Sequence, residues 1–394
     1  MTNQTSKRIP NGWEETTLGE VAEIIMGQSP KGSSYNQDQD GLPFYQGITE
    51  FGEKYVGIRN YTNEPTKIVE KNTVLFSVRA PVGKVNFTRH KACIGRGNAG
   101  LRMKNNLQEF LYYLLKQNEK AFLNNSTGTV FDSISGNELR TFKITVPKNE
   151  TEQNDIASVL SSFDDKVELL REQNKTLEAT AQAIFKEWFV NFDYPDATGK
   201  MIDSELGEIP EGWRVGKLGE VIDLFDSKRV PLASDIRAMK KGKYPYYGAT
   251  SIMDYIDDYL FDGTYLLLAE DGSVMDNKGH PVLQYVWGQF WVSNHAHVIQ
   301  GKNGFSTEIV YVFLKEANIT SIVNGAVQLK INQENLRNFE ILIPSNDLLD
   351  KFDSILESIF MKYKNNISQI QTLSILRDTL LPKLMKGEIR VTGF

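Results

Sequence analysis

Two long segments of the chain carry hydrophobic residues at alternating spacings of four and three positions. The first series is Ile156, Leu160, Phe163, Val167, Leu170, Leu177, Ala181, Ile184 and Trp188, and the second is Phe352, Leu356, Ile359, Tyr363, Ile370, Leu373, Leu380 and Leu384. A hydrophobic stripe this narrow is typical of a coiled coil. We therefore predict two long helices, and a helix of about 35 residues is about 50 Å long.

Polar residues interrupt both stripes, namely Asn174 in the first and Asn366 and Arg377 in the second. An antiparallel register can place Asn174 opposite Asn366. The same register pairs Ile156 with Leu384 and Trp188 with Phe352. A buried Asn pair would fix the register at some cost in stability. The alternative is that each Asn faces water at an irregular point of the stripe.

Shorter hydrophobic runs bounded by Gly, Pro and Asn predict strands elsewhere in the chain. These runs cover 73–78, 83–88, 141–146, 264–269, 282–287, 291–299 and 338–343. Residues 107–117 and 306–316 have the spacing of short amphipathic helices. The pattern indicates a mixed α/β fold without the regular alternation of strands and long helices seen in Rossmann domains.

The chain repeats itself after about 200 residues. IPNGWEETTLGEV (9–21) returns as IPEGWRVGKLGEV (209–221), and GTVFDSISGNELRTFKITVP (128–147) returns as GAVQLKINQENLRNFEILIP (325–344). Between these blocks the middles of the two halves correspond poorly. We therefore expect two similar globular domains joined by the two helices, with an internal pseudo-two-fold duplication and two divergent middles.

The duplication suggests domain limits. We expect a first recognition domain over 1–150, a central helix over 151–192, a linker over 193–208, a second recognition domain over 209–346, and a C-terminal helix and tail over 347–394. Pro382 is expected to end or kink the second helix near Leu381, because proline has no amide hydrogen to donate.

Composition is that of a globular protein, with 40% hydrophobic and 24% charged residues. No hydrophobic run approaches the ~18 residues needed to cross a bilayer. The first residues, MTNQTSKRIPNGW, lack the hydrophobic region of a signal peptide, so we expect a cytoplasmic location and no membrane partner. The single cysteine, Cys93, excludes a disulfide within the chain, and we expect it to be a buried small residue.

The net charge of −6 is unevenly distributed. Residues 78–104 contain seven Lys or Arg and no acidic residue, and residues 226–243 contain six basic and two acidic residues. Such local basic clusters are typical of surfaces that meet nucleic-acid phosphates. The candidate DNA-binding residues are Arg79, Lys84, Arg89, Lys91 and Arg96 in the first half, and Lys228, Arg229, Lys240, Lys241, Lys243, Lys278 and His280 in the second.

Known catalytic and metal-binding patterns fit the chain poorly. GRGNAG (95–100) matches the dinucleotide-binding pattern, but no hydrophobic helix follows it. His295 and His297 lie two apart on a predicted strand without a third ligand nearby, so a structural or DNA-contacting pair is favoured over a metal site. The combination of Pro195–Asp196 with Asp226 and Lys228 resembles a nuclease motif, but chance matches to so unspecific a pattern are expected, so it does not indicate a nuclease. We expect no catalytic residue and no metal site, and this favours a binding protein over an enzyme.

The order of the motifs resembles one protein family. The two Ile-Pro-x-Gly-Trp openings, YYGATSIMDYID (246–257), LEATAQAIFKEWFVNFD (177–193) and LRDTLLPKLMKGEIRV (376–391) together resemble the specificity subunit of type I restriction-modification systems. The resemblance implies two target recognition domains, each reading one half of an asymmetric bipartite DNA sequence. It also implies that the helices set the gap between the half-sites.

The resemblance further implies partners. Two modification subunits would dock on the helices, hold S-adenosylmethionine and methylate adenine, and restriction subunits would translocate and cleave double-stranded DNA with ATP and Mg. This chain would itself bind no cofactor. Phe185, Trp188, Phe189, Leu380 and Leu384 are expected either to bind a partner or to pack the helices. The alternatives are a stand-alone bipartite DNA-binding regulator, or an enzyme whose catalytic site has an unfamiliar pattern.

Overall fold

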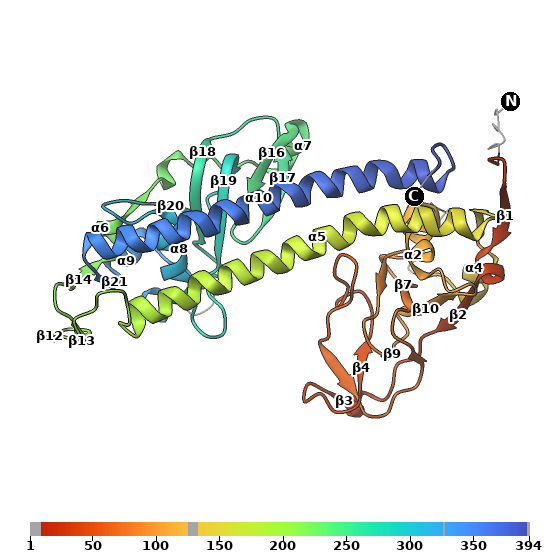
Figure 1. Ribbon diagram of the computed structural model, residues 1–394, viewed down its shortest axis with the longest axis horizontal. Helices are drawn as coiled ribbons and strands as arrows, with labels where there is room; N and C mark the ends of the chain where they lie inside the picture. Colours follow the sequence, from red (N-terminus) through yellow and green to blue (C-terminus); the bar gives the residue numbers. More distant parts are fainter. Residues whose placement is uncertain (1–8, 125–132, 326–327, 392–394) are drawn as a thin grey trace. The chain divides into compact units, whose positions relative to one another are not determined.

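The structure is a computed structural model that describes residues 9–124, 133–325 and 328–391. The chain forms two compact units (Figure 1). Unit 1 comprises Met1–Arg171 with Ser368–Phe394, and unit 2 comprises Glu172–Ile367. Parts of the second repeated block, 128–132 and 326–327, lie outside the described residues.

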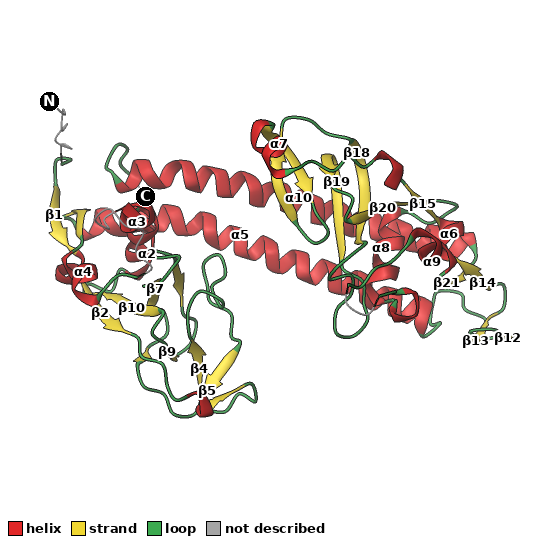
Figure 2. Cartoon of the chain, turned by 180° about the vertical axis from the view of Figure 1, so that it is seen from behind, coloured by secondary structure: helices red, strands yellow, loops and turns green. Residues whose placement is uncertain are grey.

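Both units combine small sheets with short helices and a part of each long helix (Figure 2). The elements up to the first long helix are β1 (Trp13–Thr17), α1 (Leu18–Val21), β2 (Ala22–Met26), η1 (Gly32–Ser34), β3 (Tyr35–Asn36), β4 (Leu42–Tyr45), β5 (Asn60–Thr62), β6 (Ile68–Val69), β7 (Val74–Ser77), β8 (Val85–Phe87), β9 (Ala92–Ile94), β10 (Asn98–Met103), α2 (Gln108–Gln117), α3 (Glu119–Asn124), α4 (Gly136–Thr141), β11 (Lys143–Pro147) and α5 (Glu150–Phe185). The mixed α/β class predicted from the sequence is confirmed.

The remaining elements begin with η2, a π-helical turn over Lys186–Val190. They continue with β12 (Met201–Ser204), β13 (Gly207–Pro210), β14 (Arg214–Lys217), α6 (Leu218–Val221), β15 (Ile222–Leu224), η3 (Asp226–Lys228), α7 (Ser234–Met239), β16 (Lys241–Tyr247), β17 (Ile252–Ile256), β18 (Phe261–Ala269), β19 (Leu283–Val292), β20 (Ala296–Gly301), α8 (Thr307–Glu316), η4 (Thr320–Ile322), α9 (Gln333–Asn338), β21 (Glu340–Ile343) and α10 (Asn346–Met385). Part of the predicted linker, 193–208, contributes to the antiparallel hairpin β12–β13.

The sheets show that the duplication extends through the middles of the two units. In unit 1 one sheet has the order β2-β10-β7-β8, and in unit 2 the order β15-β20-β18-β19 is the same by position and direction. The parallel pair β4–β9 of unit 1 corresponds to β16–β19 of unit 2. The middles, which correspond poorly in sequence, therefore share one backbone topology, because strand pairing depends on main-chain hydrogen bonds that tolerate many side chains.

One strand accounts for the main difference between the sheets. In unit 2, β19 runs unbroken over ten residues and joins all strands into a six-stranded sheet. In unit 1 the corresponding path is split into β8 and β9 by residues 88–91, so four-stranded and five-stranded sheets form instead.

The repeated Leu-Gly-Glu-Val segment forms α1 in unit 1 and α6 in unit 2. A Cβ atom at Gly19 would lie 3.1 Å from the carbonyl oxygen of Arg140, and one at Gly219 would lie 3.1 Å from that of Arg337. These distances are shorter than ordinary van der Waals contact. Glycine recurs in the motif because α1 and α6 lie against α4 and α9 at this distance.

The two long helices pack as the hydrophobic stripes predict. In unit 2 the Asn366 amide nitrogen donates to the Asn174 side-chain oxygen at 2.8 Å, and both residues are buried. Further along the same unit, Trp188 lies against Phe352 with ring centroids 5.7 Å apart. The pairing runs in opposite directions along the two helices, so the antiparallel register and the buried Asn pair are confirmed there. In unit 1, Ile156 belongs to the hydrophobic core that also contains the end of α10.

A buried ion pair replaces hydrophobic contact between the helices of unit 1. The Arg377 guanidinium contacts the Asp164 carboxylate, and both side chains are almost fully buried. The Tyr113 hydroxyl of α2 donates to the same carboxylate at 2.6 Å. The interruption at Arg377 is therefore a connection between the helix pair and the globular part of unit 1.

Of the two outcomes expected at Pro382, an end or a kink of the second helix near Leu381, the end is not observed, because α10 continues to Met385. Its end has the hydrogen bonds of a Schellman motif. The Gly387 amide donates to the Leu384 carbonyl at 3.0 Å and the Glu388 amide donates to the Lys383 carbonyl at 2.9 Å, with Gly387 at φ +66°. Glycine adopts this left-handed conformation readily, so it is the residue that stops the helix.

Cys93 is buried in β9, as predicted. Within the described residues, no helix combines the length and hydrophobicity that a bilayer crossing needs.

Candidate nucleic-acid interface

Several loops of unit 1 meet at one end of the β2-β10-β7-β8 sheet. The turn of residues 95–97 joins β9 to β10, and its Gly97 carbonyl accepts a hydrogen bond from the Val78 amide at 2.9 Å. The Ile134 amide donates to the Val78 carbonyl, and the Gly95 amide donates to the Tyr45 carbonyl, both at 2.9 Å. The segments that follow β4 and β7, the turn before β10 and the segment before α4 are thus held together.

The same main-chain arrangement recurs in unit 2. The Glu270 amide donates to the His295 carbonyl, the Ile331 amide donates to the Glu270 carbonyl, and the Ser293 amide donates to the Tyr247 carbonyl, each at 2.9 Å. Residues 293–295 form the turn that corresponds to 95–97. Both units therefore hold equivalent loops at the same end of equivalent sheets, and we refer to this loop set as the reading edge of each unit.

The turn at 293–295 corrects a prediction. The sequence predicts one strand over 291–299, but β19 ends at Val292 and β20 begins at Ala296. Ser and Asn at 293 and 294 favour turns through their local hydrogen bonds. His295 therefore lies in a turn while His297 lies on β20, and the two do not share a strand face. In GRGNAG a strand follows the equivalent turn, which excludes the helix that a dinucleotide site requires.

Two of the predicted arginines lie at the reading edge of unit 1. Arg79 and Arg96 are exposed and immediately follow or precede the hydrogen-bonded positions Val78 and Gly97. Among the residues that the structure describes, neither guanidinium forms an ion pair. Ser29 lies beside Arg96, and its hydroxyl accepts a hydrogen bond from the Arg96 amide at 3.2 Å. These two side chains remain available for an anionic ligand.

The other three candidates of the first half form ion pairs within the chain. Lys84 contacts Glu119 at 2.6 Å and Lys91 contacts Glu70 at 3.0 Å. Arg89 contacts Glu168 of α5 at 2.8 Å, and its guanidinium lies 4.1 Å from the centroid of the Tyr55 ring. The cluster contains no acidic residue in sequence but meets several in space.

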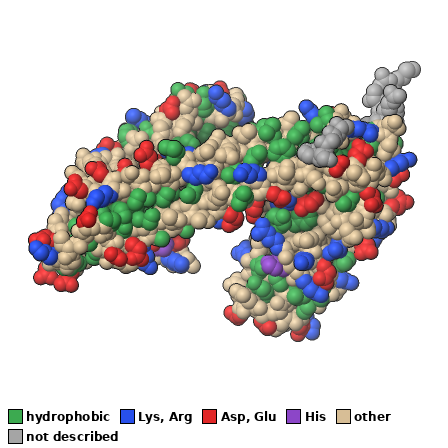
Figure 3. All heavy atoms as spheres, in the orientation of Figure 1, with side chains coloured by type: hydrophobic (Ala, Val, Ile, Leu, Met, Phe, Trp, Pro, Cys, Tyr) green, Lys and Arg blue, Asp and Glu red, His purple; other side chains and the backbone are tan. Residues whose placement is uncertain are grey.

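Several candidates of the second half are also paired. Lys240 contacts Asp257 at 3.0 Å, Lys241 contacts Asp254, and His280 contacts Asp276 at 3.4 Å. The low content of acidic residues in the two basic clusters therefore does not leave all of their cations unpaired, because folding brings acidic residues from other segments against them. Basic and acidic side chains are intermingled over the face of the molecule shown in Figure 3.

Three of the four remaining candidates of the second half are exposed. Lys228, Lys243 and Lys278 are exposed, and the structure shows no ion pair for them among the residues it describes. Lys228 lies in η3, directly after β15, and Lys278 lies in the loop between β18 and β19. Lys278 therefore belongs to a loop of the reading edge of unit 2, and η3 adjoins this edge, because its Asp226 carboxylate accepts a hydrogen bond from the Val298 amide of β20 at 2.9 Å. Lys330, which the sequence prediction missed, is also exposed; it forms an isolated bridge with Asp271 and contacts Glu270 at 3.3 Å.

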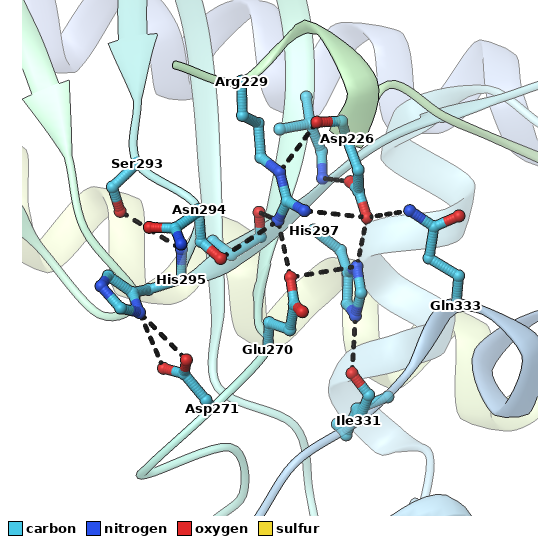
Figure 4. A network of polar contacts seen from close by, with 12 residues as sticks. Asp226, Arg229, Glu270, Asp271, Ser293, Asn294, His295, His297, Ile331 and Gln333 are labelled. Carbon is cyan, nitrogen blue, oxygen red and sulfur yellow. Dashed lines mark hydrogen bonds and ion pairs between the residues drawn. The ribbon is translucent and has the colours of Figure 1, made fainter. Parts of the chain in front are cut away.

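Arg229 belongs instead to a buried polar network under the reading edge of unit 2 (Figure 4). Its guanidinium contacts Glu270 at 2.7 Å and donates to the Ala296 carbonyl at 2.6 Å. Only 12% of its side chain is exposed. The prediction that Arg229 contacts DNA is not supported, because its donors hold loops of the protein together.

The centre of this network is the buried pair of Asp226 and His297. The His297 Nδ1 lies 2.6 Å from the Asp226 carboxylate and its Nε2 lies 2.9 Å from the Ile331 carbonyl oxygen. Gln333 of α9 donates to the same carboxylate at 2.6 Å. Burial by itself raises the pKa of Asp226, but the hydrogen bond from His297 and the charges of His297 and Arg229 hold that pKa below its usual range.

Asp226, Glu270 and His297 also have the chemistry of metal ligands, with ligand atoms within 4.8 Å of one another. Arg229 lies between the two carboxylates, however, and supplies the positive charge that a metal ion would bring. All three side chains are engaged with partners from the protein. The geometry therefore fits a structural network better than a metal centre.

Unit 1 has hydrophobic residues at the positions of this network. The strand registers and the main-chain bonds align Asp226 with Met26, Glu270 with Val78, and His297 with Ala99. Gly136 takes the place of Gln333, and a Cβ atom there would lie 3.0 Å from Met26. The two reading edges thus share a main-chain frame but rest on chemically different supports.

The aromatic residues of the predicted partner or packing set lie inside unit 2. Phe185 is buried and stacks on Phe189 with a centroid distance of 5.1 Å, and Phe189 lies 4.8 Å from Phe352. Trp188 packs partly buried against the same core. In unit 1, Leu384 is buried and Leu380 packs partly buried beside it. These five residues are buried wholly or in part by packing within the chain, against the globular part of their own unit as well as between the helices.

The comparisons with known proteins agree with this architecture. The family profile described as "Type I restriction modification DNA specificity domain" matches residues 10–179 and 210–369. The type I restriction enzyme MjaIX specificity subunit of Methanocaldococcus jannaschii is 29% identical over 415 residues, covering 98% of this chain and 95% of that protein. The putative MjaX specificity subunit of the same organism is 41% identical over 180 residues, covering 45% of this chain and 42% of that protein.

A solved structure shares the fold. The crystal structure of the type I restriction-modification S subunit from M. genitalium matches with a TM-score of 0.59 and 18% identity, and the match covers 98% of each chain. Since the family profile matches both halves and the MjaIX subunit aligns along nearly the whole length, the chain belongs to the specificity subunits of type I restriction-modification systems.

Proposed function

We propose that each unit reads one half of an asymmetric bipartite DNA sequence through its reading edge. The observation that carries this proposal is the shared main-chain frame of the two edges, which presents different side chains in each unit. Arg79 and Arg96 would meet DNA in unit 1, and Lys228 and Lys278 in unit 2. Phosphate contacts fix position, and base edges in the major groove carry the sequence information.

The long helices would set the gap between the half-sites and dock two methyltransferase subunits. Large hydrophobic residues on their surface support a docking role. Leu169 of α5 is 51% exposed, and Met361, Ile375 and Leu376 of α10 are 64%, 66% and 45% exposed. Contiguous exposed hydrophobic residues are typical of surfaces that a partner covers, and among these four Ile375 and Leu376 are adjacent in the chain.

The chemistry would reside on the partners. S-adenosylmethionine would bind the methyltransferase subunits, and ATP and Mg would serve restriction subunits that translocate and cleave DNA. This chain would act in the cytoplasm as the non-catalytic subunit that selects the site.

An exchange of residues 28–105 for those of a family member tests whether each unit reads only its own half-site. The chimera and the natural chain would each be expressed with the methyltransferase recovered in a pull-down, and methylated sites would be mapped by methylome sequencing. We expect one half-site to change while the other half-site and the gap remain. A chimera with both half-sites altered would contradict the proposal, and specific binding without any methyltransferase partner would favour a stand-alone regulator.

A further inference from the structure

His295 has an unusual place at the reading edge of unit 2. It lies in the turn between β19 and β20, and 49% of its side chain is exposed. Its Nδ1 lies 3.1 and 3.0 Å from the two carboxylate oxygens of Asp271, the residue that follows Glu270 in the loop after β18. An exposed imidazole is thereby fixed in one orientation.

The contact with Asp271 determines what the ring presents to a ligand. A carboxylate is only an acceptor, so Nδ1 carries the hydrogen of this contact. In the neutral ring the opposite nitrogen, Nε2, is then a hydrogen-bond acceptor. Figure 4 shows the far side of the His295 ring directed away from Asp271 and from the buried network. Within the part of the chain that the structure describes, Nε2 has no hydrogen-bond partner.

The protein beneath His295 is rigidly connected. The His295 carbonyl accepts from the Glu270 amide at 2.9 Å, and Arg229 joins Glu270 to the carbonyl of Ala296, the next residue along the chain. The turn that carries the imidazole and the loop that carries Asp271 are therefore both anchored to the buried network. Recognition sites require such support, because a contact atom must be held within a fraction of an ångström.

The equivalent positions of unit 1 have a different chemistry. The strand registers place Gly97 at the position of His295, and the isolated bridges Arg79–Ser133 and Asp271–Lys330 place Arg79 at the position of Asp271. Unit 1 therefore has an arginine at the position of Asp271, and a glycine without a side chain at the position of the His295 imidazole. The difference lies at the same point of a shared frame.

We propose that His295, oriented by Asp271, contacts a base edge in the half-site read by unit 2 and is a specificity-determining residue. This inference rests on the proposed function of the reading edges. An Nε2 acceptor fits the amino groups of adenine N6 or cytosine N4, which are donors in the major groove. Asp271 acts as a positioning residue, since it orients the ring and fixes its tautomer.

The test is a binding selection with duplexes in which both half-sites are randomised, using the full chain in complex with the methyltransferase recovered with it. We expect His295→Ala to reduce discrimination at one base pair of one half-site by about tenfold. The other positions and the other half-site should stay as in the natural chain. His295→Gln should restore part of the discrimination, because the glutamine amide offers hydrogen-bonding atoms in a similar place.

Two controls separate recognition from stability. Arg96→Ala, in the equivalent turn of unit 1, should affect only the other half-site. The thermal midpoint of His295→Ala should equal that of the natural chain, because the side chain is exposed. Equal weakening on all sequences, or unchanged discrimination at every base pair, would overturn the assignment of His295. A natural complex that selects no bipartite sequence would overturn the proposed function itself and His295 with it.

Discussion

The reading edges of the two units differ more below the surface than in their main chains. In unit 1 the edge rests on Met26, Val78 and Ala99, whereas in unit 2 the equivalent positions are Asp226, Glu270 and His297. The main-chain hydrogen bonds that join the loops are the same. A duplicated fold can therefore exchange hydrophobic packing for a directional polar network without altering its loop frame.

The helix pair shows a similar divergence. In unit 2 the polar contact between α5 and α10 is the neutral pair Asn174 and Asn366, whereas in unit 1 it is the ion pair Asp164 and Arg377. Only the ion pair extends into the globular part, through the Tyr113 hydroxyl. The neutral pair serves the register of the helices, while the ion pair also fixes α2 of unit 1 to them.

The largest expected effect comes from removing the charge at the centre of the unit 2 network. Asp226→Asn should lower the free energy of unfolding by about 3 kcal/mol, because His297 and Arg229 would lose a buried ionic partner. Met26→Leu, at the equivalent position of unit 1, is the control and should cost less than about 1.5 kcal/mol. Urea unfolding of the full chain measures both. Equal losses for the two variants would contradict the contrast between the supports.

The same variant has a defined pH dependence. The pKa of Asp226 is held below its usual range in the folded state, so its stabilising contribution is present above the pKa of the unfolded chain and is lost as the pH falls through the folded value. The stability gap between the natural chain and Asp226→Asn should narrow as the pH falls below about 4. A gap that widened on acidification would refute this sign.

The next prediction compares how exposed cations and ion-paired cations contribute to the salt dependence of DNA binding. The binding constant for DNA falls as the salt concentration rises. If both arginines meet phosphate, the double variant Arg79→Ala with Arg96→Ala should reduce the magnitude of the slope of log binding constant against log salt concentration by about 2. Lys240→Ala with Lys241→Ala should lower it less, because Asp257 and Asp254 already neutralise these lysines. DNA titrations at several salt concentrations give both slopes. A larger change for the lysine pair would show that the ion pairs open on DNA binding.

The smallest effect concerns the helix contacts. Asn174→Leu should cost about 1–2 kcal/mol, because it leaves the buried Asn366 amide without its partner. Adding Asn366→Leu should restore the free energy of unfolding. The matching double replacement of Asp164 and Arg377 by Leu should not, because the Tyr113 hydroxyl would lose its acceptor. Urea unfolding measures the free energy of unfolding of both double variants. If both regained the value of the natural chain, the distinction between the neutral pair and the ion pair would be contradicted.

Patterns repeated along the chain were sufficient to predict much of the fold. The coiled-coil stripes, the antiparallel register and the two short amphipathic helices are confirmed, because side-chain periodicity directly reflects which face of a helix is buried. The duplication of the ends was equally visible. Local patterns failed at single turns, as at 293–295, and the end of α10 lies at a glycine cap beyond Pro382.

The candidate sites were harder to predict. Basic residues were identified, but their acidic partners come from distant segments, as with Arg89 and Glu168 or Lys241 and Asp254. Glu270 and Asp271 were missed, although two acidic residues directly after the hydrophobic strand YLLLA are a recognisable signal at a strand end.

By itself the sequence determined the duplicated architecture and the family, because these depend on periodicity and on motifs in a fixed order. Only the tertiary structure decided which cations remain exposed, that Arg229 and His297 support the loops, and that His295 presents an oriented ring. The reason is physical: whether a charged side chain is available depends on the partners that folding brings to it, and those partners lie far away in the chain, as with Arg89 and Glu168 or Arg377 and Asp164.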